Sequence, residues 1–252
     1  HIHNYPISGV TMPLIDALRK LGVDVSIRAY EDADLLIGPN KGLLASQNSH
    51  SGKLTVRGKG FRPLSQPDFI HHKDLPEIYC GRSGTAMRLL AGLAVASGVQ
   101  ITLTGDESLS GRPMESLAAH LRAMNGNVKT TDGHPPIVIG RRACHLSGKH
   151  HELKRPSAQI HAAICIAAIT GTYKTTIFSE LPFRDHTVPM LQAFGANVEN
   201  RGTRMEEADS LPSAVGTMTT ISPSETPWLS GVPTEGGKPK GMTFLPGDIS
   251  SA

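Results

Sequence analysis

Arginine, glycine and serine gather where four helices are expected to begin, and this pattern favours the binding of anions. Helix N-termini carry free N–H groups and a positive partial charge, and a nearby arginine adds a two-pronged donor for phosphate or carboxylate. The first of the four segments is not a P-loop, because it lacks the lysine of GxxxxGK[ST]. The segments are Gly81-Arg82-Ser83-Gly84-Thr85, Arg112-Pro113, Arg155-Pro156-Ser157-Ala158-Gln159 and Arg184-Asp185.

A single arginine near a helix start is usually a solvated surface residue. Four such starts in equivalent frames of a repeat favour a shared site for a multiply charged anion. We expect Pro113 at the first position of its helix and Asp185 as the N-cap of the last one.

Three segments repeat one pattern, in which an amphipathic helix leads through a turn into a strand. When they are aligned on Val25, Val128 and Val198, apolar residues recur four, seven and ten places earlier, which is the spacing of one helix face. Three places before each valine stand Gly22, Asn125 and Gly195, residue types that end helices in the left-handed conformation. The pattern indicates a repeated structural unit.

The second and third copies contain an earlier helix as well, beginning at Gly84 and at Ser157. Both helices are rich in alanine, leucine and isoleucine and carry almost no charge, so we expect them inside the domain. With the flanking strands, the unit is β-α-β-α-β-β. The first copy shows only its second helix and last strands, including GKLTVRG at residues 52–58. Residues 29–53 and 61–79 are predicted to be loops, and residues 202–241 a connection with no clear period.

Composition excludes several classes of function. The chain of 252 residues has 25 basic and 22 acidic residues and no basic run, which argues against nucleic-acid binding. No apolar stretch is long enough to span a membrane. Three well-separated cysteines predict neither a disulfide framework nor a zinc site. The paired histidines are expected in solvated loops, and a reducing, cytoplasmic location fits the free thiols.

Motifs at the same positions resemble the EPSP synthase family (3-phosphoshikimate 1-carboxyvinyltransferases). CGRSGTAMRLLAGL is similar to GN(S/A)GT-x-R-x-L, GDESLSGRPMESL to GD-x-SL-x-x-RPM, and RPSAQIHAAI to the SAQ or SSQ helix start. FRDHTVPMLQAFGA resembles (S)RDHTE-x-ML-x-x-FGA, and LPGDISSA resembles PGD-x-SSA. The resemblance implies an inside-out, barrel-like α/β domain of three β-α-β-α-β-β units, with buried helices and outer sheets.

The resemblance also implies an activity and a set of ligand-binding residues. The activity is transfer of the carboxyvinyl group of phosphoenolpyruvate to the 5-hydroxyl of shikimate 3-phosphate, with no cofactor and no metal. Ser157, Ala158, Gln159 and Arg184 would bind shikimate 3-phosphate. Gly84, Arg112 and Gln159 would bind phosphoenolpyruvate. Arg82 and Phe183 depart from the family pattern, which has Asn and usually Ser there.

Family segments that supply the acid–base carboxylates are not seen, so we expect a fragment without catalytic residues whose partner is the second domain of the same enzyme. Residues 1–240 are expected to form one transferase-type domain with an incomplete first repeat, and 241–252 the start of the next. The start, His1 to Asn4, suggests a chain that begins within a longer gene. Two other interpretations stay open: a UDP-N-acetylglucosamine enolpyruvyl transferase, whose nucleophilic cysteine motif is not seen, and a non-catalytic anion-binding module.

Overall fold

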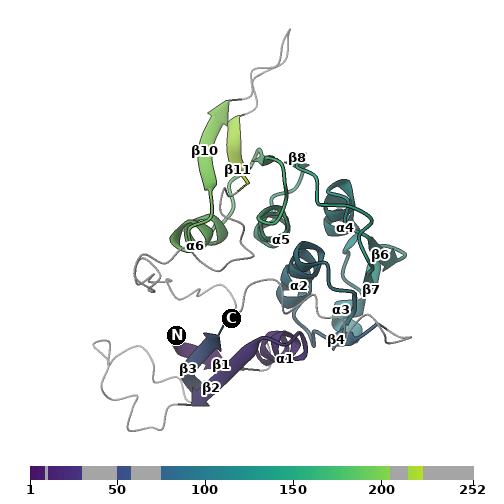
Figure 1. Cartoon of the computed structure of the whole chain (residues 1–252), viewed down its shortest axis with the longest axis vertical. Coiled ribbons are helices and arrows are strands. Elements are labelled where there is room, and N and C mark those ends of the chain that lie inside the picture. Colours follow the sequence, from purple (N-terminus) through teal and green to yellow (C-terminus); the bar gives the residue numbers. More distant parts are fainter. Residues whose placement is uncertain (9–10, 30–49, 58–74, 205–214, 224–252) are drawn as a thin grey trace.

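Three antiparallel or mixed sheets and six helices make up the described part of the chain (Figure 1). The computed structural model describes residues 1–8, 11–29, 50–57, 75–204 and 215–223. The helices are α1 (Met12–Lys20), α2 (Gly84–Ser97), α3 (Glu107–Ser110), α4 (Glu115–Ala123), α5 (Ala158–Ala168) and α6 (Thr187–Ala193). The strands are β1 (Ile2–Ile7), β2 (Asp24–Ala29), β3 (His50–Arg57), β4 (Glu77–Tyr79), β5 (Ile101–Thr104), β6 (Val128–Thr131), β7 (His134–Ile139), β8 (His150–Leu153), β9 (Thr175–Ser179), β10 (Val198–Arg204) and β11 (Val215–Ile221).

Two of the sheets have four strands each and share one topology. In the first, the order is β4-β5-β7-β6, with β4 parallel to β5 and the other pairs antiparallel. In the second, the order is β8-β9-β11-β10, again with one parallel pair, β8 and β9. In chain order, a helix follows the first strand of each unit and another helix comes directly before its third strand. Both units therefore follow the predicted β-α-β-α-β-β order.

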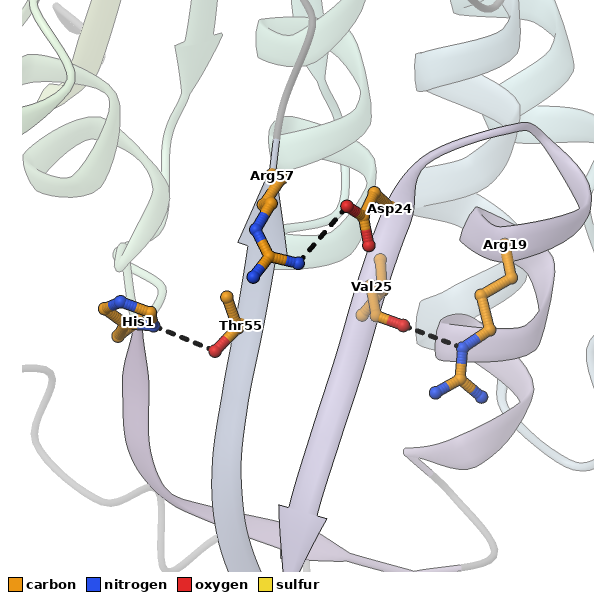
Figure 2. Close-up of polar contacts among 6 residues, drawn as sticks. All are labelled: His1, Arg19, Asp24, Val25, Thr55 and Arg57. Carbon is orange, nitrogen blue, oxygen red and sulfur yellow. Dashed lines mark hydrogen bonds and ion pairs between the residues drawn. The ribbon is translucent and has the colours of Figure 1, made fainter.

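The sheet of the first unit has the order β1-β3-β2, which corresponds to the last three strand positions of the other two sheets. Figure 2 shows β2 and β3 linked at one end by an ion pair between Arg57 and Asp24, at 3.3 Å. It also shows His1 hydrogen-bonded to Thr55, which ties the start of β1 to β3. The sequence did not predict β1, because its Pro6 and Asn4 are poor strand residues; β1 is an edge strand, where proline is tolerated.

Helices α2 and α5 pack against each other in the interior, as their low charge predicted (Figure 1). Most of their side chains are buried, among them Met87 and Leu90 of α2 and Ile164 of α5. The contact is so close that a Cβ at Gly92 would lie 2.5 Å from the carbonyl oxygen of Ala163. Alanine and glycine on these helices therefore set the spacing between the second and third units.

The three amphipathic helices of the repeat, α1, α4 and α6, end as predicted. Gly22, Asn125 and Gly195 have φ of 83°, 68° and 85°, the left-handed conformation that turns each chain into its strand. The apolar face is buried at Ile15, Leu121 and Val188. Phe194 is the exception, since half of it is exposed.

A further contact recurs in all three units, between the helix and the strand that follows it. Arg19, Arg122 and Gln192 each stand six places before the aligned valine. Their side chains donate hydrogen bonds to the carbonyls of Val25, Val128 and Val198, at 3.0, 3.2 and 2.7 Å. Figure 2 shows the first of these, in which Nε of Arg19 reaches the carbonyl oxygen of Val25.

The predicted connections were wrong at several strands. Strand β3 confirms most of the predicted strand GKLTVRG but begins two residues earlier, at residue 50; β4 covers 77–79, and β10 and β11 enter the range 202–241. Strand β11 reads VGTMTTI, in which threonines take inward positions that usually hold apolar residues; Thr219 is 1% exposed. Apart from Ala29, which ends β2, and residues 75–76 and 222–223, which lie in no helix or strand, the rest of these ranges and the expected domain boundary at 240/241 lie outside the described residues. Closure of the units into a barrel-like domain stays a prediction.

Candidate anion-binding site

The N-termini of the two interior helices are capped in the same way. The hydroxyl oxygen of Ser83 accepts a hydrogen bond from the amide of Ala86 at the start of α2, at 3.1 Å. The hydroxyl oxygen of Ser157 does the same for Ile160 at the start of α5, at 3.3 Å. Both serines have extended backbone, as N-cap residues do. Since α2 and α5 pack together, their starts place Gly84 and Gln159 within one cluster of side chains.

Two guanidinium groups approach the backbone at Gly84. A Cβ built on Gly84 would lie 2.9 Å from a terminal nitrogen of Arg88 and 3.1 Å from one of Arg112. Arg88 donates to the side-chain oxygen of Gln159 and to the carbonyl of Pro113. We call Gly84, Thr85, Arg88, Arg112 and Gln159 the arginine cluster.

Gln159 is held at both ends of its amide. Its oxygen accepts from Arg88, and its nitrogen donates to the hydroxyl of Thr85 at 2.7 Å. These two contacts fix which way the amide points. Because Gln159 follows the N-cap of α5 and Thr85 follows that of α2, the contacts also bind the two helix starts together.

The electrostatics of the cluster favour an anion. Burial, and secondly the nearby charge of Arg112, lower the pKa of Arg88. Within the described ranges, no carboxylate forms an ion pair with Arg88 or Arg112. Two like charges held close together without a counter-ion are stabilised when an anion binds between or beside them.

The predicted residue Arg184 lies on the segment just before α6, and it is exposed. On one side of it, Phe183 packs its ring against the buried imidazole of His161, with centroids 4.8 Å apart. On the other side, Asp185 accepts from the amides of Thr187 and Val188 and from Asn200. The segment that carries Arg184 is thereby attached to α5, the helix whose start carries Ser157, Ala158 and Gln159.

Two expectations about helix starts need correction. Helix α4 begins at Glu115, so Pro113 precedes its N-cap, Met114, and does not take the first helical position. Arg112 accordingly lies on the link between the short α3 and α4, where its amide donates to the carbonyl of Leu109. At α6 the N-cap position falls on His186, although the side chain of Asp185 provides the capping bonds that were predicted.

Arg82, one of the departures from the family pattern, is a surface residue. Its side chain is 80% exposed and pairs with Asp106, at 3.1 Å. The charge that Arg82 adds next to the N-cap of α2 is therefore balanced by the carboxylate of Asp106.

Arg88 and Thr85 are the members of the cluster that sequence reasoning did not select. The signal was present, since Arg88 is the arginine of the GTAMRLL stretch and stands one turn after Gly84 on the same helix face. It is also the only charged residue in α2, and an isolated charge on an otherwise apolar helix indicates a specific partner.

Cysteines and histidines take no part in this cluster. The three cysteines are free, with Cys80 and Cys165 buried and Cys144 exposed. Burial raises the pKa of the Cys80 thiol to about 12. His151, which was expected in a solvated loop, lies buried on β8. Across the described parts of the chain, no three histidine, cysteine, aspartate or glutamate side chains gather as metal ligands, and no helix is long and apolar enough to cross a membrane.

Repeated α/β units around two buried helices, with arginines near the helix starts, define an α/β protein with a candidate anion-binding site. The family model for EPSP synthase (3-phosphoshikimate 1-carboxyvinyltransferase) matches residues 65–207, more than half of the chain. The chain therefore belongs to the EPSP synthase family.

Individual relatives agree with this assignment. The chain is 38% identical over 169 residues to a 3-phosphoshikimate 1-carboxyvinyltransferase of Lactiplantibacillus plantarum, a match that covers 67% of this chain and 37% of the relative. It is 40% identical over 149 residues to the enzyme of that name from Legionella pneumophila, covering 58% and 32%. An EPSP synthase structure from Acinetobacter baumannii is 28% identical with a TM-score of 0.62, covering 88% of this chain and 42% of that one. The chain thus spans well under half the length of these relatives.

Proposed function

We propose that this chain is the anion-binding part of an enzyme that transfers the carboxyvinyl group of phosphoenolpyruvate to the 5-hydroxyl of shikimate 3-phosphate. The observation that carries the proposal is the arginine cluster, in which Arg88 and Arg112 approach one glycine and form no ion pair with any carboxylate of the described residues. Both substrates are anions with phosphate groups, which arginine binds through paired hydrogen bonds. The names of the matched relatives support this substrate pair over a UDP-sugar.

In this proposal the cluster binds phosphoenolpyruvate. Arg112 and Arg88 hold its charged groups, and Gly84 lets the ligand approach the helix start because no Cβ intervenes. Gln159, oriented by Arg88 and Thr85, contacts both ligands. Ser157 and Ala158 at the start of α5, together with Arg184, hold shikimate 3-phosphate. The shikimate ring then lies between the start of α5 and Arg184.

The chemical step requires a general acid and a general base within hydrogen-bond reach of the reacting atoms. The family segments that supply these carboxylates are not seen in the sequence, and the match to the Lactiplantibacillus plantarum relative covers 37% of that protein. In this proposal the acid–base groups lie on a second domain, which closes over the ligands and completes the site. The proposed setting is the cytoplasm, whose reducing conditions fit three free cysteines.

Calorimetry of the 252-residue chain with shikimate 3-phosphate tests the binding role, and phosphate release with both substrates tests turnover. We expect weak binding and no turnover. Arg184→Ala should lower the affinity for shikimate 3-phosphate by about 1.5–3 kcal/mol, the contribution of a charge-assisted hydrogen bond. Arg57→Ala, which removes an arginine from the exposed pair with Asp24, is the matched control and should bind like the unaltered chain.

Equal affinity in the Arg184→Ala chain would remove Arg184 from the site. Clear turnover by the chain alone would overturn the division of binding and acid–base groups between two domains. A non-catalytic anion-binding module is favoured instead if the chain binds inorganic phosphate as tightly as it binds shikimate 3-phosphate.

A further inference from the structure

His161 is a buried histidine that the proposed binding roles do not use. It lies one turn after Ser157 on α5 and is 1% exposed. Burial lowers the pKa of His161, and the charge of Asp185 acts in the opposite direction. Its Nε2 lies 2.9 Å from the hydroxyl of Thr219 on β11, and the thiol of Cys165 lies within 3.9 Å of both ring nitrogens.

The ring of His161 supports Phe183. The two ring centroids are 4.8 Å apart, with the planes tilted by 54°, within the range of favourable aromatic contacts. Thr219 is 1% exposed as well, so the hydrogen bond to the imidazole is shielded from water and holds the ring in one orientation. A fixed ring below Phe183 fixes the backbone of the residue that follows it, which is Arg184.

Asp185 restrains the same segment from the other side. Its carboxylate accepts from two amides of α6 and from Nδ2 of Asn200, at 3.0–3.1 Å. Arg184 lies between Phe183, which packs on His161, and Asp185, which is hydrogen-bonded to α6. His161 belongs to α5, whose first turn carries Ser157 and Gln159, so the contact between His161 and Phe183 joins two segments that are 22 positions apart.

We infer that His161 is a positioning residue for the bound phosphate: held by Thr219, it supports Phe183 and thereby sets Arg184 relative to the start of α5. The inference rests on the proposed function, in which Arg184 and the start of α5 hold shikimate 3-phosphate. It assigns a role to Phe183, the residue that departs from the family pattern. The aromatic ring of Phe183 packs against His161, a contact that the serine usual in the family could not make.

The test measures the affinity of the chain for shikimate 3-phosphate by calorimetry after His161→Ala and after Phe183→Ala. Both changes should weaken binding roughly tenfold, because the arginine loses its fixed position. The half-exposed Phe183 keeps the test decisive if His161→Ala fails to fold. His151→Ala is the matched control, since His151 is equally buried (2% exposed) but contacts His120 instead, and it should leave the affinity unchanged.

Two further measurements separate positioning from general destabilisation. In an Arg184→Ala background, Phe183→Ala should have no additional effect on shikimate 3-phosphate, because the two residues act through one contact. The affinity for phosphoenolpyruvate should change less than about twofold, because Arg88 and Arg112, the charged residues of the arginine cluster, lie on α2 and the α3–α4 link. An undiminished effect in the double variant, or an equal loss for both ligands, would overturn the inference.

The outcomes also separate this inference from the proposed function. A chain that binds shikimate 3-phosphate through Arg184 but is insensitive to His161→Ala and Phe183→Ala refutes the positioning role alone. A chain whose affinity is unaffected by Arg184→Ala refutes the proposed site and the inference together.

Discussion

Arg88 and Gln159, 71 positions apart in the chain, are hydrogen-bonded across the contact between α2 and α5. The bond connects the N-terminal parts of two helices from different repeat units. Arg88 also reaches the carbonyl of Pro113, next to Arg112. One guanidinium therefore holds together all the segments that form the arginine cluster.

Replacing Arg88 tests whether this group is there for an anion or for the fold. Arg88→Met removes a partly buried charge that Arg112 repels, so we expect the free energy of unfolding to change by less than about 1.5 kcal/mol. The affinity for phosphoenolpyruvate should fall by about 1.5–3 kcal/mol, because a charged donor is lost and Gln159 loses its orientation. Thermal unfolding and calorimetry measure the two quantities.

Arg82→Met is the matched control, since it makes the same chemical change on the same helix start. Arg82 is 80% exposed and pairs with Asp106 at the surface. It should alter neither quantity appreciably. If both variants bind phosphoenolpyruvate like the unaltered chain, Arg88 serves packing alone.

Gly84→Ala should separate stability from binding. Alanine is better than glycine in a helix by about 0.8–1 kcal/mol, and the new methyl group meets only the mobile ends of Arg88 and Arg112. The melting temperature should therefore stay the same or rise. The displaced guanidiniums should bind phosphoenolpyruvate more weakly, seen as a higher Kd in the chain or a higher KM in the complete enzyme. An unchanged constant would show that Gly84 serves packing only.

Gly92→Ala is the same substitution in the same helix, with the opposite expectation for stability. Here the methyl group would lie 2.5–3.0 Å from backbone atoms of Ala163, which can move only if α2 and α5 separate. Overpacking costs about 1–3 kcal/mol and should exceed the gain in helix propensity. Gly202→Ala, where the methyl group meets open space, is the control for chemical denaturation. Equal midpoints for the two variants would contradict the close helix contact.

Much of the fold could be predicted because its signals are local. Gly22, Asn125 and Gly195 show the same left-handed turn in sequence and in structure, since only certain residue types adopt it cheaply. The interior helices α2 and α5 were recognisable from their lack of charge. Strands β1 and β11 were missed, because Pro6 and a row of threonines break the apolar alternation on which strand prediction depends.

The site was predictable only in part, for a physical reason. Sequence motifs pointed to Gly84, Arg112 and Gln159, and the structure brings all three together around Arg88. The contacts of Arg88 with Gln159 and of His161 with Phe183 depend on how helices and loops distant in sequence pack. No local periodicity encodes such contacts. The sequence placed the start of α4 at Pro113, because proline is common at the first helical position. In the structure Pro113 lies just before the helix, whose N-cap is Met114.

The hydrogen bond from helix to strand that recurs in the three units predicts that glutamine can replace arginine as its donor without loss of stability. Gln192→Met keeps a similar shape but cannot donate to the carbonyl of Val198, so it should lower the free energy of unfolding by about 1 kcal/mol. Arg122→Gln should retain stability, because glutamine already makes the equivalent bond in the third unit. Denaturant unfolding of both variants measures this. An unchanged free energy of unfolding in Gln192→Met would show that the contact has no energetic role, and a loss in Arg122→Gln equal to that in Gln192→Met would show that glutamine cannot replace arginine there.

Stability should fall in mild acid because of the buried histidine on β8. Burial lowers the pKa of His151 to about 4, with the charges of His120, His150 and Lys149 adding to the effect. A histidine has a pKa near 6.5 when unfolded, so the unfolded chain takes up the proton first. The contribution of His151 to the free energy of unfolding is thus fully present above about pH 6.5. It is lost as pH falls toward 4, and the loss is on the order of 3 kcal/mol.

In His151→Gln, the free energy of unfolding measured between pH 7.5 and 4.5 should depend less on pH. His145→Gln, at an exposed position, should keep the dependence of the unaltered chain. Identical slopes in all three chains would show that His151 does not resist protonation in the folded state.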